Sequence, residues 1–325
     1  MSFDNDGGKF TPGHRVRSGK TVPSQVRLLS PYARGVLLVI AATLMWSLSG
    51  LFVRNVPAVD PWTLNAYRGF SCGSCLTLYM VVRYGGAAWG HVASSGFKPI
   101  VLAGGFFALG STLYIVALSF ASVASVSCLG ATSPIFAALL AWVVMRERTS
   151  LRLLLATIAV LVGVYLIVRS EAAEFEGGLL GSLVALGVAF CFAGQTVMLR
   201  RFRHFEMTPA IALGGFACAV VITVVHGFVL LPARDMLIIF AMGLIQLAIP
   251  LVCYIEGAKS VTAVQAALIA LGDVVLNPFW AWLGKGELPP NGTYLGGALI
   301  VAAIVAATVQ RRGGDPALPA VPRVE

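Results

Sequence analysis

Charged side chains are scarce in this sequence of 325 residues, at 11%, where soluble domains carry roughly 25%. A water-soluble protein of 34.2 kDa could not cover its surface with the 23 basic and 14 acidic side chains that are present. The shortage therefore excludes an ordinary soluble domain. Hydrophobic residues make up 58% of the sequence and form long runs. These runs predict an integral membrane protein with many spans.

Motifs for metals, nucleotides and cofactors are also missing. The six cysteines all fall within apolar runs, and Cys72-Gly-Ser-Cys75 has no second pair or histidine cluster beside it. No Walker motif, dinucleotide fingerprint or HExxH sequence occurs. We therefore expect no cofactor, no metal site and no ATP-driven step within the chain. The net charge of +9 does not predict nucleic-acid binding, because almost all of it lies between or beyond the apolar runs.

Ten apolar segments, each near the roughly 20 residues that a bilayer core requires, follow one another with short connections. The segments are 35–53, 61–82, 99–118, 123–144, 151–168, 178–199, 209–231, 236–255, 262–283 and 293–309. They predict an all-α integral membrane protein with ten transmembrane helices. Residues 1–34 and 311–325 are predicted to be disordered tails. A signal peptide is the alternative for the N-terminal segment, but no small-residue cleavage site follows its first apolar run.

Lysine and arginine are divided unequally between the two predicted sides of the membrane. Eighteen of the 23 basic residues lie on the side that holds both tails, four lie on the other side, and Arg68 lies inside a span. Short basic loops are retained on the cytoplasmic side. The distribution therefore predicts that both termini are cytoplasmic, in a multi-pass protein of a bacterial inner membrane.

The two halves of the chain repeat each other in two registers. An offset of 146 residues pairs Arg54 with Arg200, Asp60 with Glu206, Gly69 with Gly215, Phe70 with Phe216, and Cys72 with Cys218. An offset of 140 pairs Tyr114 with Tyr254, Ile115 with Ile255, Ala141 with Ala281, Trp142 with Trp282, and Glu147 with Glu287. We therefore predict two five-helix units, 35–169 and 177–310. Because five is odd, the repeat is inverted, which indicates a carrier with alternating access and a midplane site.

Several motifs carry a resemblance to a known family. They are Met45-Trp46-Ser47-Leu48-Ser49-Gly50, Arg68-Gly69-Phe70, and the stretch from Ser133-Pro134 through Ala141-Trp142 to Glu147. Over residues 35–310 the chain resembles the EamA-type, ten-helix members of the drug/metabolite transporter superfamily. It departs from the family where Glu-Pro is frequent, since Asp273-Val274 stands there with Pro278 one turn later. The resemblance implies a secondary transporter, with export favoured, of a small amphipathic metabolite such as an amino acid, a vitamin or a drug-like compound.

Asp273 and Arg68 are the charged residues predicted at membrane depth, where a charge costs roughly 2.5–3.5 kcal/mol. Asp273 lies eleven residues into its segment, which is roughly 16 Å at 1.5 Å per residue. Its carboxylate is predicted to bind a cationic group of the substrate or to carry a coupling proton. The alternative is a fixed ion pair with Arg68 that closes the outer side.

Other polar, aromatic and proline residues within the spans complete the candidate site. Aromatic rings and amides suit a cavity for an amphipathic solute, but such rings can also face lipid and such amides can bond across helices. Prolines in mid-span free backbone carbonyls and suit gates. The candidates for substrate binding are Trp46, Ser47, Ser49, Asn65, Arg68, Tyr114, Gln195, Gln246, Tyr254, Asp273 and Asn277, and those for gating are Pro134 and Pro250.

Two other classes of function compete with a carrier. An intramembrane enzyme would have to start from Asp273, but aspartyl hydrolysis needs two cooperating carboxylates and the spans contain no second one at that depth. A membrane scaffold or receptor is the third class. Small residues at every fourth position from Gly177 to Ala193 allow close packing within the chain or in a homodimer. We predict a transporter that is not an enzyme, with a small-molecule substrate and the lipid bilayer as partners.

Overall fold

The computed structural model describes residues 30–53, 55–87, 90, 96–120, 126, 129–170, 179–285 and 291–309. Every regular element among them is a helix, as the all-α prediction requires. Five helical stretches are long and apolar enough to span a membrane: Pro31–Val53, Phe97–Ala117, Leu180–Arg201, Thr208–His226 and Ala233–Ala258. Shorter apolar helices cover Ser133–Met145, Leu151–Ile167, Ala263–Leu276 and Tyr294–Thr308. The chain is thus a multi-pass membrane protein, and the count of ten spans stays a prediction.

The helices follow the predicted segments in order. They are α1 (Pro31–Trp46) with α2 (Ser49–Val53), α3 (Pro61–Tyr84) followed by the short η1 (Gly85–Ala87), α5 (Phe97–Phe120), α7 (Ser133–Met145), α8 (Leu151–Ser170), α9 (Leu179–Arg201), α10 (Thr208–His226), α11 (Ala233–Met242) with η2 (Gly243–Ala248) and α12 (Ile249–Ala258), α13 (Ala263–Ala270) with α14 (Asp273–Lys285), and α15 (Asn291–Thr308).

Two predicted boundaries are wrong for identifiable reasons. α1 begins at Pro31, before the predicted 35, because the Ser30 side chain accepts a hydrogen bond from the Ala33 N–H and caps the helix, with proline in the first position. α10 ends at His226, before the predicted 231. Its next residue, Gly227, adopts a φ of 92°, which favours glycine and stops the helix.

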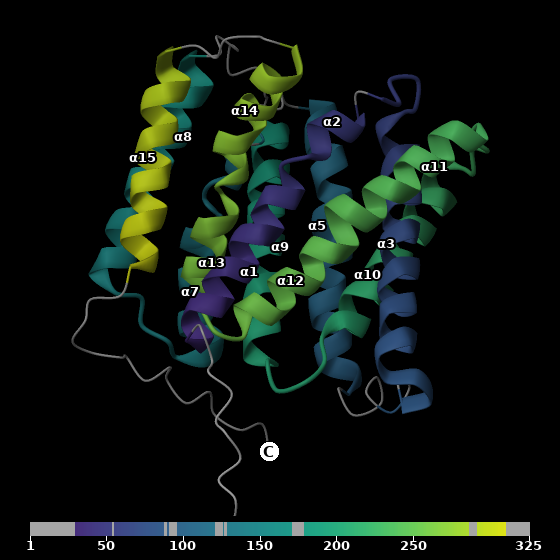
Figure 1. Cartoon of the computed structure of the whole chain (residues 1–325), viewed down its shortest axis with the longest axis horizontal. Helices are drawn as coiled ribbons and strands as arrows, with labels where there is room; N and C mark the ends of the chain where they lie inside the picture. The colour runs from purple at the N-terminus through teal and green to yellow at the C-terminus, as the bar shows by residue number, and fades with distance from the viewer. Residues whose placement is uncertain are drawn as a thin grey trace, which may run out of the picture.

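Helix packing follows a two-fold pattern. Figure 1 shows α8 and α15 side by side at one end of the molecule and α3 and α10 at the other, and both pairs are in contact. Between them, α5 packs on α9 as α12 packs on α1, and α7 packs on α9 as α13 packs on α1. α7 and α13 also contact each other. The helix contacts of the first half of the chain are thus repeated in the second half.

Small residues bring the two units together. A Cβ atom on Gly69 would lie 2.9 Å from the carbonyl oxygen of Gly215, and one on Gly215 would lie 2.7 Å from the carbonyl oxygen of Gly69. These equivalent glycines therefore allow α3 and α10 to touch backbone to backbone. On α9, Ala185, Ala189 and Ala193 are buried, so that part of the small-residue stripe serves packing within the chain.

The first and last described helices meet on one side of the protein. The Tyr32 hydroxyl, in the first turn of α1, donates to the carbonyl oxygen of Thr308 at the end of α15, at 2.8 Å. Gln265 at the start of α13 donates to the same hydroxyl and to the carbonyl oxygen of Ala307. Both ends of the helical part of the chain, seen at the bottom of Figure 1, therefore lie on the same side. The predicted tails fall almost entirely outside the described residues.

Candidate functional site

Two helices are broken by a tight turn at equivalent positions of the two units. Before α7, the Thr132 N–H donates to the carbonyl oxygen of Leu129 at 3.1 Å. Between α13 and α14, the Gly272 N–H donates to the carbonyl oxygen of Ile269 at 3.0 Å. The bonds that follow, to the carbonyl oxygens of Thr132 and Gly272, also match at the offset of 140. Hydrogen bonds between residues three apart, as in a 3-10 helix, often mark functional hinges when they interrupt a helix. Transporter binding sites are often formed by such discontinuous helices.

Two more helices depart from regular geometry where they approach the centre. α1 ends at Trp46, and α2 resumes three residues later at Ser49. η2 is a π-helical stretch between α11 and α12, and Pro250 follows it at the start of α12. Pro134 likewise lies at the start of its helix, α7. Both prolines predicted to act in gating therefore lie beside a change of helical geometry.

A cavity of about 190 Å³ lies between α1, α3, α5, α9 and the η2–α12 segment, so both units contribute to it. Pockets for drug-sized ligands begin at roughly 300 Å³, and this cavity therefore suits a smaller solute. Most of its wall is apolar. The lining residues are Trp46, Arg68, Phe106, Phe107, Gly110, Ser111, Tyr114, Val188, Phe192, Gln195, Leu247 and Leu251.

Arg68 is the charged residue of this wall. Its Nη2 donates to Asn65 Oδ1 at 2.9 Å, and Ser111 Oγ donates to the same oxygen at 3.0 Å. The Asn65 amide in turn donates to the carbonyl oxygen of Ser111 at 3.1 Å. The Nε atom of Arg68 is buried and has no hydrogen-bond partner among the described residues. A neutral amide thus orients the guanidinium without balancing its charge.

The two charges predicted at membrane depth are not paired. Among the described residues, no ion pair joins Arg68 to Asp273. Asp273 is the first residue of α14. The alternative of a fixed Arg68–Asp273 pair is therefore not formed in this conformation.

A layer of aromatic rings fixes one side of the cavity. The ring of Trp46 lies 5.1 Å from that of Tyr254 and 6.1 Å from that of Phe192, measured between centroids. Tyr254 itself is fully buried, and its hydroxyl shares a 2.8 Å hydrogen bond with that of Thr196. Tyr254 therefore supports Trp46 from behind, while Trp46 and Phe192 line the cavity.

The residues predicted to bind substrate fall into four groups. Trp46, Arg68, Tyr114 and Gln195 line the cavity. Asn65, Gln246 and Tyr254 contact lining residues from behind, since the Gln246 amide donates to the carbonyl oxygen of Trp46 at 3.3 Å. Ser47 accepts a 2.7 Å hydrogen bond from Trp280 Nε1, which ties the break in α1 to α14, while Asp273 lies at the start of α14. The side chains of Ser49 and Asn277 lie outside the described part of the structure.

Several lining residues were not predicted from the sequence. Phe106, Phe107 and Phe192 sit in uniformly apolar segments, where a ring that faces a cavity looks the same as one that faces lipid. Ser111 was the available signal, because a hydroxyl in such a segment needs a partner. It finds that partner in Asn65 at 3.0 Å.

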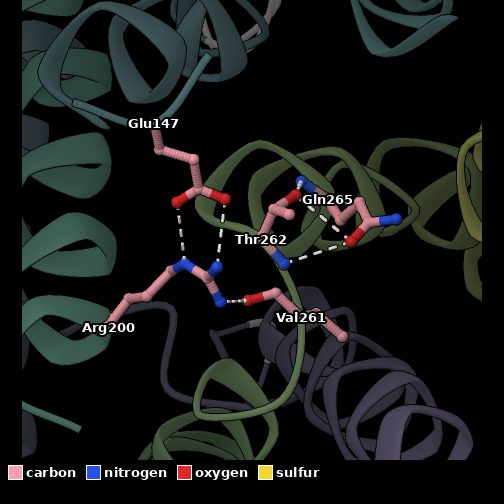
Figure 2. Close-up of polar contacts among 5 residues, drawn as sticks. All are labelled: Glu147, Arg200, Val261, Thr262 and Gln265. Atoms are coloured by element: carbon pink, nitrogen blue, oxygen red, sulfur yellow. Dashed lines mark hydrogen bonds and ion pairs between the residues drawn. The ribbon is translucent and has the colours of Figure 1, made fainter. Parts of the chain in front are cut away.

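A buried charge cluster joins the two units on the side of the helical termini (Figure 2). Arg200 at the end of α9 donates from Nε and Nη2 to the two carboxylate oxygens of Glu147, at 3.1 and 3.0 Å. Its Nη1 donates to the carbonyl oxygen of Val261. The side chains of Arg200 and Glu147 are only 1% and 12% exposed. Beside them, Thr262 and Gln265 form a capping box that starts α13.

Equivalent carboxylates lie just before the second helix of each unit, outside the spans. Asp60 accepts from the backbone N–H groups of Trp62 and Thr63 at 3.0 Å each. Glu206 accepts from the backbone and hydroxyl of Thr208 and from the Tyr84 hydroxyl. Partial burial alone would raise the pKa of Glu206, but these hydrogen bonds outweigh it and hold that pKa below its ordinary value. The pKa of Asp60 is lowered in the same way.

The described residues form an all-helical, multi-pass membrane protein with a small cavity between helices from both halves of the chain. The sequence matches the EamA-like transporter family over residues 33–169 and 179–309, so the chain belongs to this family. It is therefore a transporter of the drug/metabolite type and not an enzyme.

Three curated relatives are similar along most of the chain. The pseudopaline exporter CntI of Pseudomonas aeruginosa is 25% identical over 283 residues, which cover 86% of this chain and 97% of that protein. Human solute carrier family 35 member G1 is 26% identical and covers 85% of this chain and 79% of its own length. The uncharacterized transporter YwfM of Bacillus subtilis is 24% identical and covers 83% and 92%. A crystal structure of 20% identity, with a TM-score of 0.72, covers 84% of this chain and 96% of its own and supports the fold alone.

Proposed function

We propose that this protein is a secondary transporter that exports a small amphipathic metabolite by alternating access. Its site is the central cavity, with Trp46, Arg68, Tyr114 and Gln195 among the contact residues. The metabolite is in the class of amino acids, vitamins or small drug-like compounds. The proposal includes ten spans in two inverted units, both termini in the cytoplasm, and residence in a bacterial inner membrane.

One observation carries this proposal: a small cavity lined by both units lies beside helices that are broken or distorted in both. A carrier needs a site that each unit can cover in turn. The matched turns before α7 and between α13 and α14 give the two units hinges at equivalent places. Asn65, Gln246 and Tyr254 then hold the lining residues in position.

The Glu147–Arg200 ion pair holds one side of the cavity closed. It bridges the end of α7, the end of α9 and the connection before α13, and it is almost inaccessible to solvent. On the predicted topology this side is cytoplasmic. Opening the cavity toward the cytoplasm would separate these elements, so the pair would act as a latch that holds this conformation.

Direction and coupling rest on further observations. Export is favoured because a relative that matches 86% of the chain is named an exporter and is bacterial. Asp273 begins α14, directly after the tight turn between α13 and α14, and the Trp280–Ser47 hydrogen bond ties α14 to the break in α1 beside the cavity. A carboxylate at a hinge near the site can bind a proton in exchange for substrate, which would couple flux to a proton gradient.

Flux measured in proteoliposomes tests the proposal. The purified protein should move members of a metabolite panel across the membrane without ATP. Trp46→Ala should raise the KM for a transported solute, because its ring lines the cavity. Trp142→Ala is the matched control, since that ring is 51% exposed on α7 and does not line the cavity. Absence of flux for every solute would contradict transport and leave a scaffold or receptor, and equal effects of the two variants would contradict the assigned site.

A further inference from the structure

We infer that the cavity binds its substrate through a carboxylate or a similarly compact anionic group, which docks on the guanidinium of Arg68. The inference rests on the proposed function and names the chemical class of the solute. It also assigns Asn65 as a positioning residue for Arg68.

The first step is the unbalanced charge. Arg68 lies on α3 and faces the cavity, and the described part of the structure holds no acidic side chain within ion-pairing distance of it. A buried guanidinium costs several kcal/mol when no anion accompanies it. A site of this kind gains most from a ligand that brings the missing negative charge.

The second step is the available donor geometry. A guanidinium offers five N–H donors in a planar fork that matches a carboxylate. Nη2 is held by Asn65 Oδ1 at 2.9 Å, which fixes the plane of the fork, while the buried Nε bonds to no residue that the structure describes. The guanidinium N–H groups that bond to no described residue therefore remain for an incoming anion.

The third step is the choice of an amide at position 65. Asn65 stands one helical turn before Arg68 and uses its amide group as well, donating to the Ser111 carbonyl oxygen at 3.1 Å. An aspartate at this position would provide an internal counter-charge to Arg68. Asparagine, in contrast, orients the guanidinium but does not neutralise it, so that the positive charge of Arg68 is available to an anionic substrate.

The other lining residues indicate the shape and polarity of the rest of the solute. Phe106, Phe107, Phe192 and Trp46 surround the space around Arg68, and the volume is about 190 Å³. Aromatic walls favour a flat or short apolar body. The expected ligand is therefore a compact carboxylate with one small apolar group.

Binding to the purified protein tests this class with two series of three probes, and the probes within a series are of similar size. Phenylacetate, phenylacetamide and phenethylamine share one ring and differ in head group, and octanoate with its amide and amine repeats the comparison with a flexible body. We expect the carboxylate to bind at least tenfold more tightly than the amide or the amine at pH 7.5. Equal or tighter binding of the amide or the amine in both series, or no binding of any probe, would overturn the inference.

Two variants separate recognition from folding. Asn65→Asp should keep the protein folded and reduce carboxylate affinity at least tenfold, because the new carboxylate occupies the guanidinium. Arg68→Lys should keep the charge but lose the fork, and so reduce the preference for a carboxylate over an amide. Unchanged carboxylate binding in Asn65→Asp would contradict the role of Arg68. If the protein transports only neutral or cationic solutes, the inference of a carboxylate substrate is refuted and the proposed transport function stands. If no solute is transported, both are refuted.

Discussion

Glu147→Gln is expected to destabilise the folded protein strongly. The substitution keeps the size of the side chain and one acceptor oxygen, but it removes the negative charge that faces Arg200. Arg200 is among the largest fully buried side chains of the described residues, and it uses three nitrogens in this cluster, two of them on Glu147. The variant therefore leaves a buried guanidinium with neutral partners.

The magnitude follows from burial. Removing one partner of a buried ion pair costs about 3–5 kcal/mol, because the remaining charge stays out of water without compensation. With side chains 1% and 12% exposed, the Arg200–Glu147 pair belongs to this class. Each 1.4 kcal/mol is a factor of about ten, so the ratio of folded to unfolded protein should fall by about 10² to 10³ or more.

A second ion pair provides a matched control. Lys259 and Glu256, on the same side of the protein, are 2.7 Å apart, with side chains 25% and 31% exposed. Partly exposed pairs of this kind contribute about 0–1 kcal/mol. Glu256→Gln should therefore cost far less than Glu147→Gln.

The assay is reversible unfolding in mixed micelles, followed by circular dichroism, for the wild type and both variants. Arg200→Met combined with Glu147→Gln should recover part of the lost stability, because the double variant no longer buries a lone charge. If Glu147→Gln costs no more than Glu256→Gln, or if the double variant is less stable than either single one, the reasoning from burial is refuted.

Three further outcomes are expected. Gly215→Val should lower the thermal unfolding temperature in detergent by several degrees, because its Cβ would lie 2.7 Å from the carbonyl oxygen of Gly69, whereas Gly105→Val, with open space around it, should not. The lowered pKa of Glu206 means that its contribution to stability is present above the unfolded pKa of about 4.3 and is lost as pH falls through the folded value. Wild-type unfolding temperatures should therefore drop in acid more than those of Glu206→Gln, and parallel curves would contradict this. Asp273→Asn should remove the pH dependence of concentrative transport in proteoliposomes and keep downhill exchange, and unchanged pH-dependent transport would exclude the coupling role.

The sequence by itself determined the helices and their order. Spans in a bilayer must satisfy all their backbone hydrogen bonds internally, so length and apolarity predict helices directly. Predicted segments such as 61–82 and 236–255 correspond to the helical stretches Pro61–Tyr84 and Ala233–Ala258. The register of the repeat also came from the sequence, and it coincides with the matched turns at Thr132 and Gly272.

The tertiary structure alone decided which side chains form the site. Tyr114 and Tyr254 are equivalent in the repeat, yet Tyr114 lines the cavity and Tyr254 is fully buried behind Trp46. Arg68 meets Asn65 one turn away and not Asp273. Sequence cannot separate these outcomes because lipid and protein interior are both apolar, so a span that is apolar on all sides carries no signal of which face points inward. That choice depends on how helices of both units pack, which only contacts distant in sequence fix.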